Sequence, residues 1–212
     1  MLKKSEITPD AVARALTRAG LSVFTNNARN FNLNLVGIRS DNRKADGFDD
    51  WFTCFWVTPD GNWMSYVWAW TTDPGRYFLT KKLLNPKGCA ILAPGQYHGA
   101  YKIGYHRGQY KALVQRGAAV NVYRDKDRDM MLDASGPIHR GFYGINIHRP
   151  SKNVSVNAAR VGRTSAGCQV SQRGADHVQL MQLAEKAEAA FGNSFTYTLI
   201  TEATFRAGQS LS

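Results

Sequence analysis

The sequence contains little cysteine and no long hydrophobic run, and each shortage excludes a class of protein. Its three cysteines are an odd number in 212 residues, so they form no complete disulfide framework and suit synthesis in a reducing compartment. Neither a Cys-x-x-Cys nor a His-x-x-x-His spacing occurs, which argues against zinc, and we expect no metal and no cofactor. No run of about 18 apolar residues is present, so we expect no transmembrane segment.

Acidic residues are scarce as well. The chain has 16 Asp and Glu against 27 Lys and Arg, a net charge of +11. Such a surplus favours an anionic partner, either nucleic acid or the anionic bacterial cell envelope. The basic residues are spread along the chain without a dense Lys/Arg run, a zinc finger or an RNA-recognition motif. We therefore expect no nucleic-acid partner and favour the envelope.

An export signal is also missing from the first residues. The charged start Met1–Lys4 is followed by a polar stretch at 5–10, where a signal peptide would carry an apolar segment. We expect the protein to be made in the cytoplasm without a signal peptide.

The composition and periodicity indicate a packed, β-rich fold. Hydrophobic residues make up 43% of the chain and aromatic residues 11%, which predicts a single domain over residues 1–212. A helix is expected over about 8–20, with Thr8 as N-cap and Pro9 at its first position, and it could be peripheral to the domain. A second helix is expected over 176–191. The pattern predicts an α+β fold of mostly antiparallel strands with a helix at each end. The main strands are expected at 31–35, 51–57, 63–70, 118–123, 142–148 and 195–201.

Five tryptophans gather in two of these strands, on either side of a Pro-Asp-Gly turn at 59–61. Their rings could stack on sugars, but packing in a core is the interpretation that we favour. Alternating strands cannot direct all five inward, so we expect some exposed aromatic surface. The tryptophans are Trp51, Trp56, Trp63, Trp68 and Trp70.

A run of aspartates follows the strand at 118–123. The spacing Asp125, Asp127, Asp129 and Asp133 is similar to that of a calcium loop. However, an EF-hand would need glycine at the position of Met130 and glutamate at the position of Gly136. We interpret the run as a charged hairpin tip.

Of the three cysteines, Cys168 has the sequence surroundings expected of a reactive thiol. Cys54 and Cys89 lie in apolar strands and are interpreted as buried small hydrophobes. Cys168 ends the small-residue run 165–168, twenty residues after His148, and His148 itself ends the strand-like run 144–148. Nearby arginines, Arg160 and Arg163, predict an electropositive setting that favours the thiolate. A cysteine with a base and free backbone N–H groups can act as a nucleophile on a carbonyl.

This histidine followed by Ser-x-Gly-Cys resembles the catalytic domain of the L,D-transpeptidase (YkuD-like) family, over roughly residues 140–172. The resemblance implies an antiparallel β-sandwich or barrel with flanking helices. It also implies that Cys168 is the nucleophile, that His148 is the base, and that the backbone N–H groups of Gly167 and Cys168 bind the oxyanion. Two departures, Arg149 in place of glycine and Val170 in place of arginine, are typical of a divergent branch of the kind found in bacteriophages.

Further residues are predicted to support this site. We expect Ser165 and Asn146 to line it and to orient His148 or the substrate; alternatively, Ser165 caps the turn and Asn146 binds backbone. Arg149 and Gln169 are also expected to support the site. The remaining histidines are interpreted as surface or hydrogen-bonding residues, namely His98, His106, His139 and His177.

The resemblance and the charge together predict a peptidoglycan-degrading cysteine peptidase, specifically a phage endolysin that cleaves peptide stems or cross-links through a thioester. It would be a monomer that reaches the cell wall after release from the host cytoplasm or as a virion component. One alternative is an L,D-transpeptidase or L,D-carboxypeptidase that modifies peptidoglycan. Another is a non-catalytic envelope-binding or glycan-binding virion component.

Overall fold

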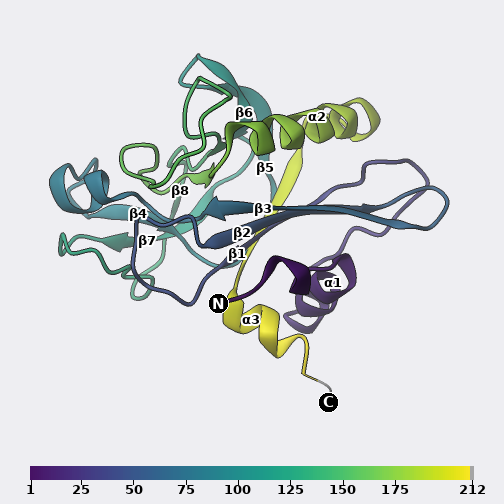
Figure 1. Ribbon diagram of the computed structural model, residues 1–212, viewed down its shortest axis with the longest axis horizontal. Coiled ribbons are helices and arrows are strands. Elements are labelled where there is room, and N and C mark those ends of the chain that lie inside the picture. Colours follow the sequence, from purple (N-terminus) through teal and green to yellow (C-terminus); the bar gives the residue numbers. More distant parts are fainter. Residues whose placement is uncertain (211–212) are drawn as a thin grey trace.

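The computed structural model describes residues 1–210 and shows a β-rich α+β fold (Figure 1). Eight strands close into a barrel in the order β1-β11-β5-β6-β9-β10-β3-β2. Closure leaves the barrel without a free edge and gives it one continuous interior. Its strands are β1 (Asn34–Arg39), β2 (Asp50–Val57), β3 (Trp63–Thr71), β5 (Gly95–His106), β6 (Tyr110–Gln115), β9 (Ile147–His148), β10 (Gln169–Ser171) and β11 (Phe195–Thr201).

The barrel is not wholly antiparallel. The pairs β1–β11 and β9–β10 run parallel, and the other pairs in the barrel are antiparallel. Parallel neighbours need a long connection, and the polar segment 149–168 supplies it between β9 and β10. The expectation of a β-rich α+β fold with mostly antiparallel strands is therefore confirmed.

The hairpin of β2 and β3 forms where the Pro-Asp-Gly turn predicts it. Thr58 N–H donates to Asn62 O at 2.9 Å, and Gly61 adopts φ 85°, which glycine tolerates well. Trp56, Trp68 and Trp70 are buried, whereas Trp51 and Trp63 are partly exposed, so the aromatic surface expected from these strands is present only in part. The reason is that both faces of the hairpin are covered. Trp56, Trp68 and Trp70 face the barrel interior, while Trp51 and Trp63 pack under the terminal helices.

Two terminal helices cover the outer face of β1 and β2. α1 (Pro9–Arg18) begins as predicted, with Thr8 Oγ1 accepting from Ala11 N–H at 3.2 Å. It packs against α3 (Glu202–Ala207), and the two share a cluster with Val36, Ile38 and Phe55. Burying this apolar layer is what fixes the helices, because each buried aliphatic side chain contributes roughly 1.5–3 kcal/mol.

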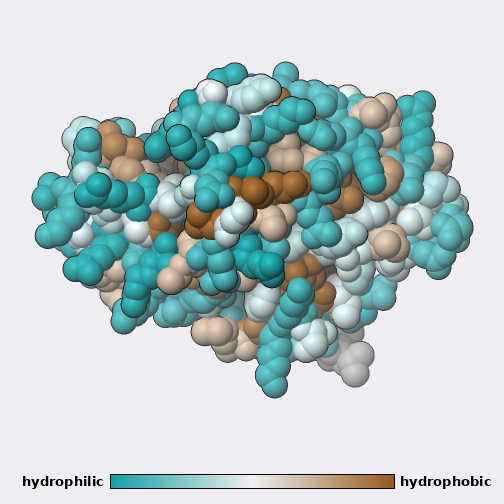
Figure 2. All heavy atoms as spheres, turned by 45° about the horizontal axis from the view of Figure 1, so that its top comes forward, coloured by the Kyte–Doolittle hydropathy of each residue, from teal (hydrophilic) through white to brown (hydrophobic). Residues whose placement is uncertain are grey.

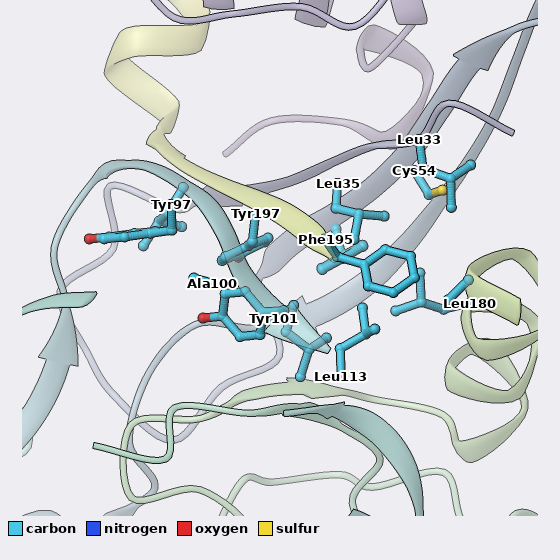
Figure 3. Close-up of a cluster of buried hydrophobic side chains, with 14 of the residues drawn as sticks. Leu33, Leu35, Cys54, Tyr97, Ala100, Tyr101, Leu113, Leu180, Phe195 and Tyr197 are labelled. Carbon is cyan, nitrogen blue, oxygen red and sulfur yellow. The ribbon is translucent and has the colours of Figure 1, made fainter. Parts of the chain in front are cut away.

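The longest helix, α2 (Gly174–Phe191), covers the main core. Its Leu180, Leu183 and Ala184 join the barrel interior, where Tyr101, Tyr197 and Phe195 also lie (Figure 3). The predicted helix at 176–191 is thus confirmed, with two more residues at its start. No helix within residues 1–210 is both long enough and apolar enough to cross a membrane.

A second, three-stranded sheet flanks the barrel in the order β4-β7-β8. It consists of β4 (Cys89–Leu92), β7 (Val120–Asp125) and β8 (His139–Gly141). Short 3-10 and π turns complete the elements, η1 (Lys4–Glu6) and η2 (Tyr77–Lys81). On the face in Figure 2, hydrophilic residues dominate and hydrophobic atoms gather near the middle.

The strand expected at 142–148 is much shorter in the structure, where only β9 remains. Gly144 takes φ 67°, which interrupts the extended backbone. The Gln115 side chain makes the hydrogen bonds that a neighbouring strand would otherwise make to this segment. Its Oε1 accepts from Tyr143 N–H at 3.0 Å and from Ile145 N–H at 3.2 Å. The irregular segment is therefore fixed by one buried amide, and it leaves room for a cavity beside it.

Candidate active site

A cavity of about 360 Å³ opens beside Cys168. Its lining comes from segments that are far apart in the sequence: the β4 strand, the end of β5, the irregular segment before β9 and the turn before β10. The polar side chains that line it include Asn85, His106, Arg107, Arg124, Asn146 and Cys168. A half-buried thiol in a concave, mostly preformed pocket with convergent polar groups is a candidate reaction centre.

The turn before Cys168 is held by Ser165. Its Oγ accepts from Gly167 N–H at 3.1 Å and donates to Cys168 O at 2.9 Å. Gly167 has φ 116°, and a Cβ there would collide with Ala90 O. Ser165 is fully buried and caps the turn. This supports the alternative in which Ser165 caps the turn over the one in which it orients His148 or the substrate.

The hydrogen bonds of this turn determine which backbone N–H groups are free to bind an oxyanion. The Gly167 N–H is occupied by Ser165 Oγ. The Cys168 N–H has no acceptor within the described residues, so it can donate to an oxyanion. Of the two backbone donors that the resemblance implies, only that of Cys168 is free here.

The ionisation of Cys168 differs from the expectation. Burial raises the pKa of Cys168 to about 11, although a backbone hydrogen bond from Asn146 and the charge of Arg107 lower it. The expected stabilisation of a thiolate by Arg160 and Arg163 is wrong, because desolvation outweighs the nearby positive charge. Cys168 is therefore a neutral thiol near pH 7 and needs a base to react.

His148 lies on β9, directly beside the strand that follows Cys168. The parallel register places His148 opposite Val170 and Gln169 opposite Ile147. Val170 and His148 therefore lie on the same face of the sheet, and Cys168 lies one residue before β10. The Cys168 Sγ contacts Gly144 O at 3.4 Å. It makes no hydrogen bond to a histidine among residues 1–210, so the direct approach of thiol and imidazole stays a prediction.

The tautomer of His148 follows from its partners. Its Nδ1 lies 2.7 Å from Arg149 O, a carbonyl that can only accept, so Nδ1 carries the proton. Tyr110 Oη donates to the same carbonyl at 2.8 Å. The Nε2 atom keeps its lone pair and, within the described chain, has no partner although it is buried. Burial and the neighbouring His106 hold the pKa of His148 well below its usual range, so its imidazole is a neutral base near pH 7.

His106 is a functional candidate that the sequence does not reveal. It lines the cavity and stacks on His148, with ring centroids 3.9 Å apart. Its tautomer is fixed by Asn146, whose Oδ1 accepts from Gln115 N–H at 3.0 Å and whose Nδ2 lies 3.2 Å from His106 Nδ1. Asn146 must therefore donate to Nδ1, which leaves the His106 proton on Nε2. Burial lowers the pKa of His106 to about 4, so it is a neutral hydrogen-bond donor.

His106 is a buried, hydrogen-bonded histidine, which agrees with one of the two expectations for it, whereas the expectation for His177 is wrong, because within the described residues its buried ring nitrogens have no hydrogen-bond partner. His177 is buried where α2 packs on the barrel, and burial lowers its pKa to about 3. His106 is buried because β5 and β6 close the barrel around it. His98 is exposed and His139 is partly exposed.

The other predicted supporting residues take different places. Asn146 lines the cavity and orients His106. The Arg149 guanidinium lies over the Tyr110 ring, 4.3 Å from its centroid, and its carbonyl fixes His148. Gln169 is fully buried and points away from the cavity lining, with Oε1 accepting from Tyr197 Oη at 2.8 Å. Gln169 therefore supports the site through the barrel interior.

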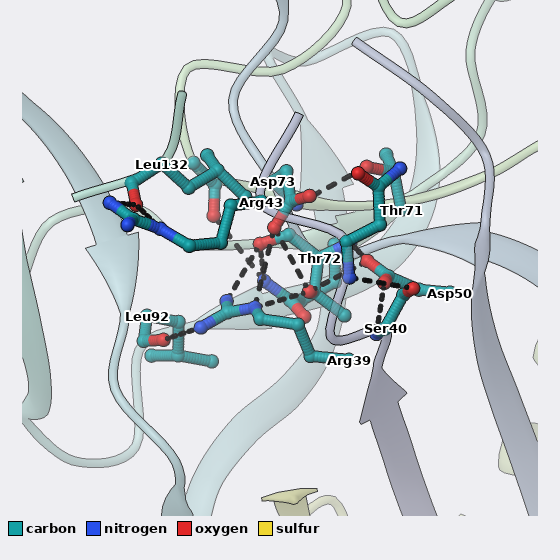
Figure 4. A network of polar contacts seen from close by, with 12 residues as sticks. Arg39, Ser40, Arg43, Asp50, Thr71, Thr72, Asp73, Leu92 and Leu132 are labelled. Carbon is teal, nitrogen blue, oxygen red and sulfur yellow. Dashed lines mark hydrogen bonds and ion pairs between the residues drawn. The ribbon is translucent and has the colours of Figure 1, made fainter. Parts of the chain in front are cut away.

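A buried polar network braces the barrel end next to Gln169 (Figure 4). Arg39 pairs with Asp73 at 3.3 Å, and Asp50 accepts from Thr72 N–H at 2.6 Å. Gln169 Nε2 donates to Thr72 O at 3.4 Å, which connects the network to the strand after Cys168. Burial raises the pKa of Asp50 to about 6, but Arg39 supplies a positive charge beside it. The network is thus satisfied internally and holds β10 in place.

With this geometry described, the chain was compared with known proteins. No family model matches it. Neither the curated proteins nor the solved structures contain a significant match.

Proposed function

We infer that the protein is a cysteine peptidase of bacterial peptidoglycan, with Cys168 as nucleophile and His148 as general base. The observations that carry this proposal are a thiol that lines the cavity and, on the neighbouring strand, a buried imidazole nitrogen that has a lone pair and no partner within the described residues. An orphaned buried nitrogen costs free energy of roughly 1–3 kcal/mol, and catalysis is one reason to retain it. The Cys168 turn and β9 also fit the motif that resembles the L,D-transpeptidase family.

The ionisation states favour general-base catalysis over a resting ion pair. The pKa of Cys168 is about 11 and the pKa of His148 lies well below its usual value, so both groups are neutral. As the thiol sulfur attacks the stem carbonyl, its proton moves to His148 Nε2. The Cys168 N–H donates to the oxyanion. The amine then leaves with the proton from His148, and a thioester remains on Cys168.

Water completes the cycle in a hydrolase. His148 takes a proton from the attacking water, the thioester C–S bond breaks, and the Cys168 thiol is restored. His106 Nε2–H is a second donor on the cavity wall, positioned by Asn146. An amine acceptor in place of water would give a transpeptidase, which is the alternative enzyme. We favour hydrolysis and a lytic, endolysin-type role at the cell wall.

Two arginines support a substrate that carries carboxylates. Arg107 and Arg124 both line the cavity beside Cys168. Peptide stems of peptidoglycan carry such groups, and a guanidinium can bind a carboxylate through two hydrogen bonds. These side chains supply the positive charge that the family carries two residues after its cysteine, where this chain has Val170. The glycan-binding alternative is weakened, since three of the five tryptophans are buried and the other two are only partly exposed.

A zymogram on purified Gram-negative peptidoglycan tests the proposal. The wild type should clear the embedded substrate, whereas Cys168→Ala should leave it intact. Cys89→Ala, which removes a second thiol from the same cavity wall, is the matched control and should retain clearing. Mass spectrometry of the soluble products identifies the bond that is cleaved. Clearing by Cys168→Ala would contradict the cysteine mechanism, and cross-linked products in place of fragments would favour transpeptidation.

A further inference from the structure

The loop between β7 and β8 concentrates negative charge in a basic protein. Four of the 16 acidic residues of the chain lie between positions 125 and 133. The structure brings three of them together, because ligand atoms of Asp125, Asp127 and Asp133 all lie within 4.8 Å of one another. The loop runs from 126 to 138 and joins the antiparallel strands β7 and β8, so the run lies at the tip of a hairpin, as expected from the sequence, although the loop is long.

Asp125 is the unusual member of this cluster. It is the last residue of β7 and only 1% exposed. Its Oδ2 accepts from Asp133 N–H at 3.1 Å, but within the described residues its buried Oδ1 has no partner. Buried carboxylate oxygens are normally paired, since an unpaired one forfeits its hydration without compensation.

Little positive charge lies close to the three carboxylates. Asp133 pairs with Arg43 at 3.4 Å, and both side chains are largely exposed. Among residues 1–210, no basic nitrogen lies within ion-pair distance of Asp125 or Asp127. Three close carboxylates with one exposed arginine leave a surplus of negative charge.

We propose that Asp125, Asp127 and Asp133 bind a divalent cation, specifically calcium. Carboxylate oxygens are the ligands that calcium prefers, and an irregular loop can adapt to its variable geometry. The three residues occupy the first, third and ninth places of a loop, as in an EF-hand. The bidentate glutamate of such a loop is replaced by Gly136. The affinity should therefore be low, with a Kd of about 0.1–1 mM, the range of extracellular modules.

The bound ion would connect the loop to the wall of the Cys168 cavity. Asp125 pairs with Cys89 of β4, and Arg124 Nη1 donates to Gly88 O at 3.2 Å. Gly88, Cys89 and Arg124 all line the cavity. Calcium would thus stabilise the three-stranded sheet as well as the loop. This inference is independent of the peptidase proposal, because it concerns binding and stability only.

Isothermal titration of the full chain with calcium tests the site directly. The protein is first treated with a chelator and then exchanged into phosphate-free buffer with about 0.15 M salt, which screens exposed charges. We expect a Kd of about 0.1–1 mM and a rise in Tm of about 3–7 °C at saturating calcium. Asp127→Asn, which changes an exposed ligand, should weaken binding about tenfold or more.

Asp129→Asn is the matched control. Asp129 lies in the same loop and loses the same charge, but it stands outside the cluster of three. It should change the Kd less than about threefold, because it does not contact the ion. Asp125→Asn should abolish binding, and if that buried change prevents folding, Asp127→Asn decides the question. A wild type that shows no calcium binding at about ten times the upper expected Kd would overturn the proposal. Equal losses in the 127 and 129 variants would also overturn it, since they indicate diffuse attraction only.

Discussion

Cys168 must lose its proton before its sulfur can attack a carbonyl, and its surroundings make that loss costly. Burial raises its pKa to about 11. Below this value the thiolate fraction falls tenfold for each pH unit. We therefore expect the rate of Cys168 alkylation by iodoacetamide to rise continuously from pH 6 to about pH 10, without a plateau near neutrality. Mass spectrometry of the labelled peptide measures the rate at this site.

Cys54 and Cys89 serve as internal references for that experiment. Both are buried, and burial raises the pKa of Cys89 to about 12 and that of Cys54 higher still. They should react more slowly than Cys168 throughout the range. A plateau in the Cys168 rate above about pH 6 would indicate a preformed thiolate–imidazolium pair and would contradict the neutral resting state.

The two stacked histidines have different tautomers, so their substitutions should have different effects. His148→Gln removes the nitrogen with the free lone pair and should lower kcat about 10²–10⁴-fold. His106→Gln keeps a side-chain donor and leaves that base in place, so the loss should be nearer tenfold. Steady-state kinetics on soluble stem peptides, with Tm measured for each variant, separate the two roles. Equal losses would mean that His106 also carries the proton.

The local part of this site could be predicted from the sequence, and the distant part could not. Cys168, Ser165, Asn146 and His148 fall in one segment, and there the resemblance to a known motif, together with the residue types, suggests a nucleophile and a base. His106 reaches the cavity through the end of β5, and Arg124 through β7. Pairing between distant strands, in the barrel for β5 and in the three-stranded sheet for β7, brings these residues to the cavity, and a single sequence does not show such pairing.

At the scale of elements, the turn before β10 depends on a glycine. Gly167 adopts φ 116°, and an added Cβ would collide with Ala90 O of β4. Gly167→Ala must therefore distort the turn that presents Cys168 or push β4 away. We expect a loss of about 1–3 kcal/mol in unfolding free energy and a large loss of activity. Chemical denaturation and the zymogram measure the two effects.

Gly61→Ala provides the matched control for that change. Gly61 also has a positive φ, 85°, but nothing lies within 4 Å of an added Cβ. It should cost only the conformational strain, about 1 kcal/mol, and leave activity intact. Equal effects of the two substitutions on activity would mean that the contact with Ala90 O does not position Cys168.

The elements themselves were predictable to different degrees. The α1 cap at Thr8 and the turn between β2 and β3 depend on local residues, and both form as expected. The strand before His148 was overestimated, because the Gln115 side chain holds Tyr143 and Ile145 in place of a neighbouring strand. That amide lies about thirty residues earlier, so periodicity around 142–148 cannot reveal it.

At the scale of the whole molecule, barrel closure affects the core, and the net charge affects encounters with other molecules. The closed barrel and its terminal helices use the apolar residues to form the core. The net charge of +11 is left for the surface, where it governs encounters with other molecules. The aromatic strands illustrate the division, because three of their tryptophans pack in the barrel core and the terminal helices partly cover the other two.

Binding to an anionic cell wall should consequently depend on salt. Screening shortens the range of exposed charges from about 10 Å at 0.1 M salt to about 3 Å at 1 M. We expect sedimentation of the protein with purified cell walls to fall steeply between these concentrations. Cys168→Ala is the form to use, because it should bind without degrading the walls. Binding that persists at 1 M salt would contradict an electrostatic origin and would indicate apolar contacts instead. The exposed rings of Tyr105 and Phe142 would then be the candidates, and Tyr105→Ser with Phe142→Ser should remove the salt-resistant fraction.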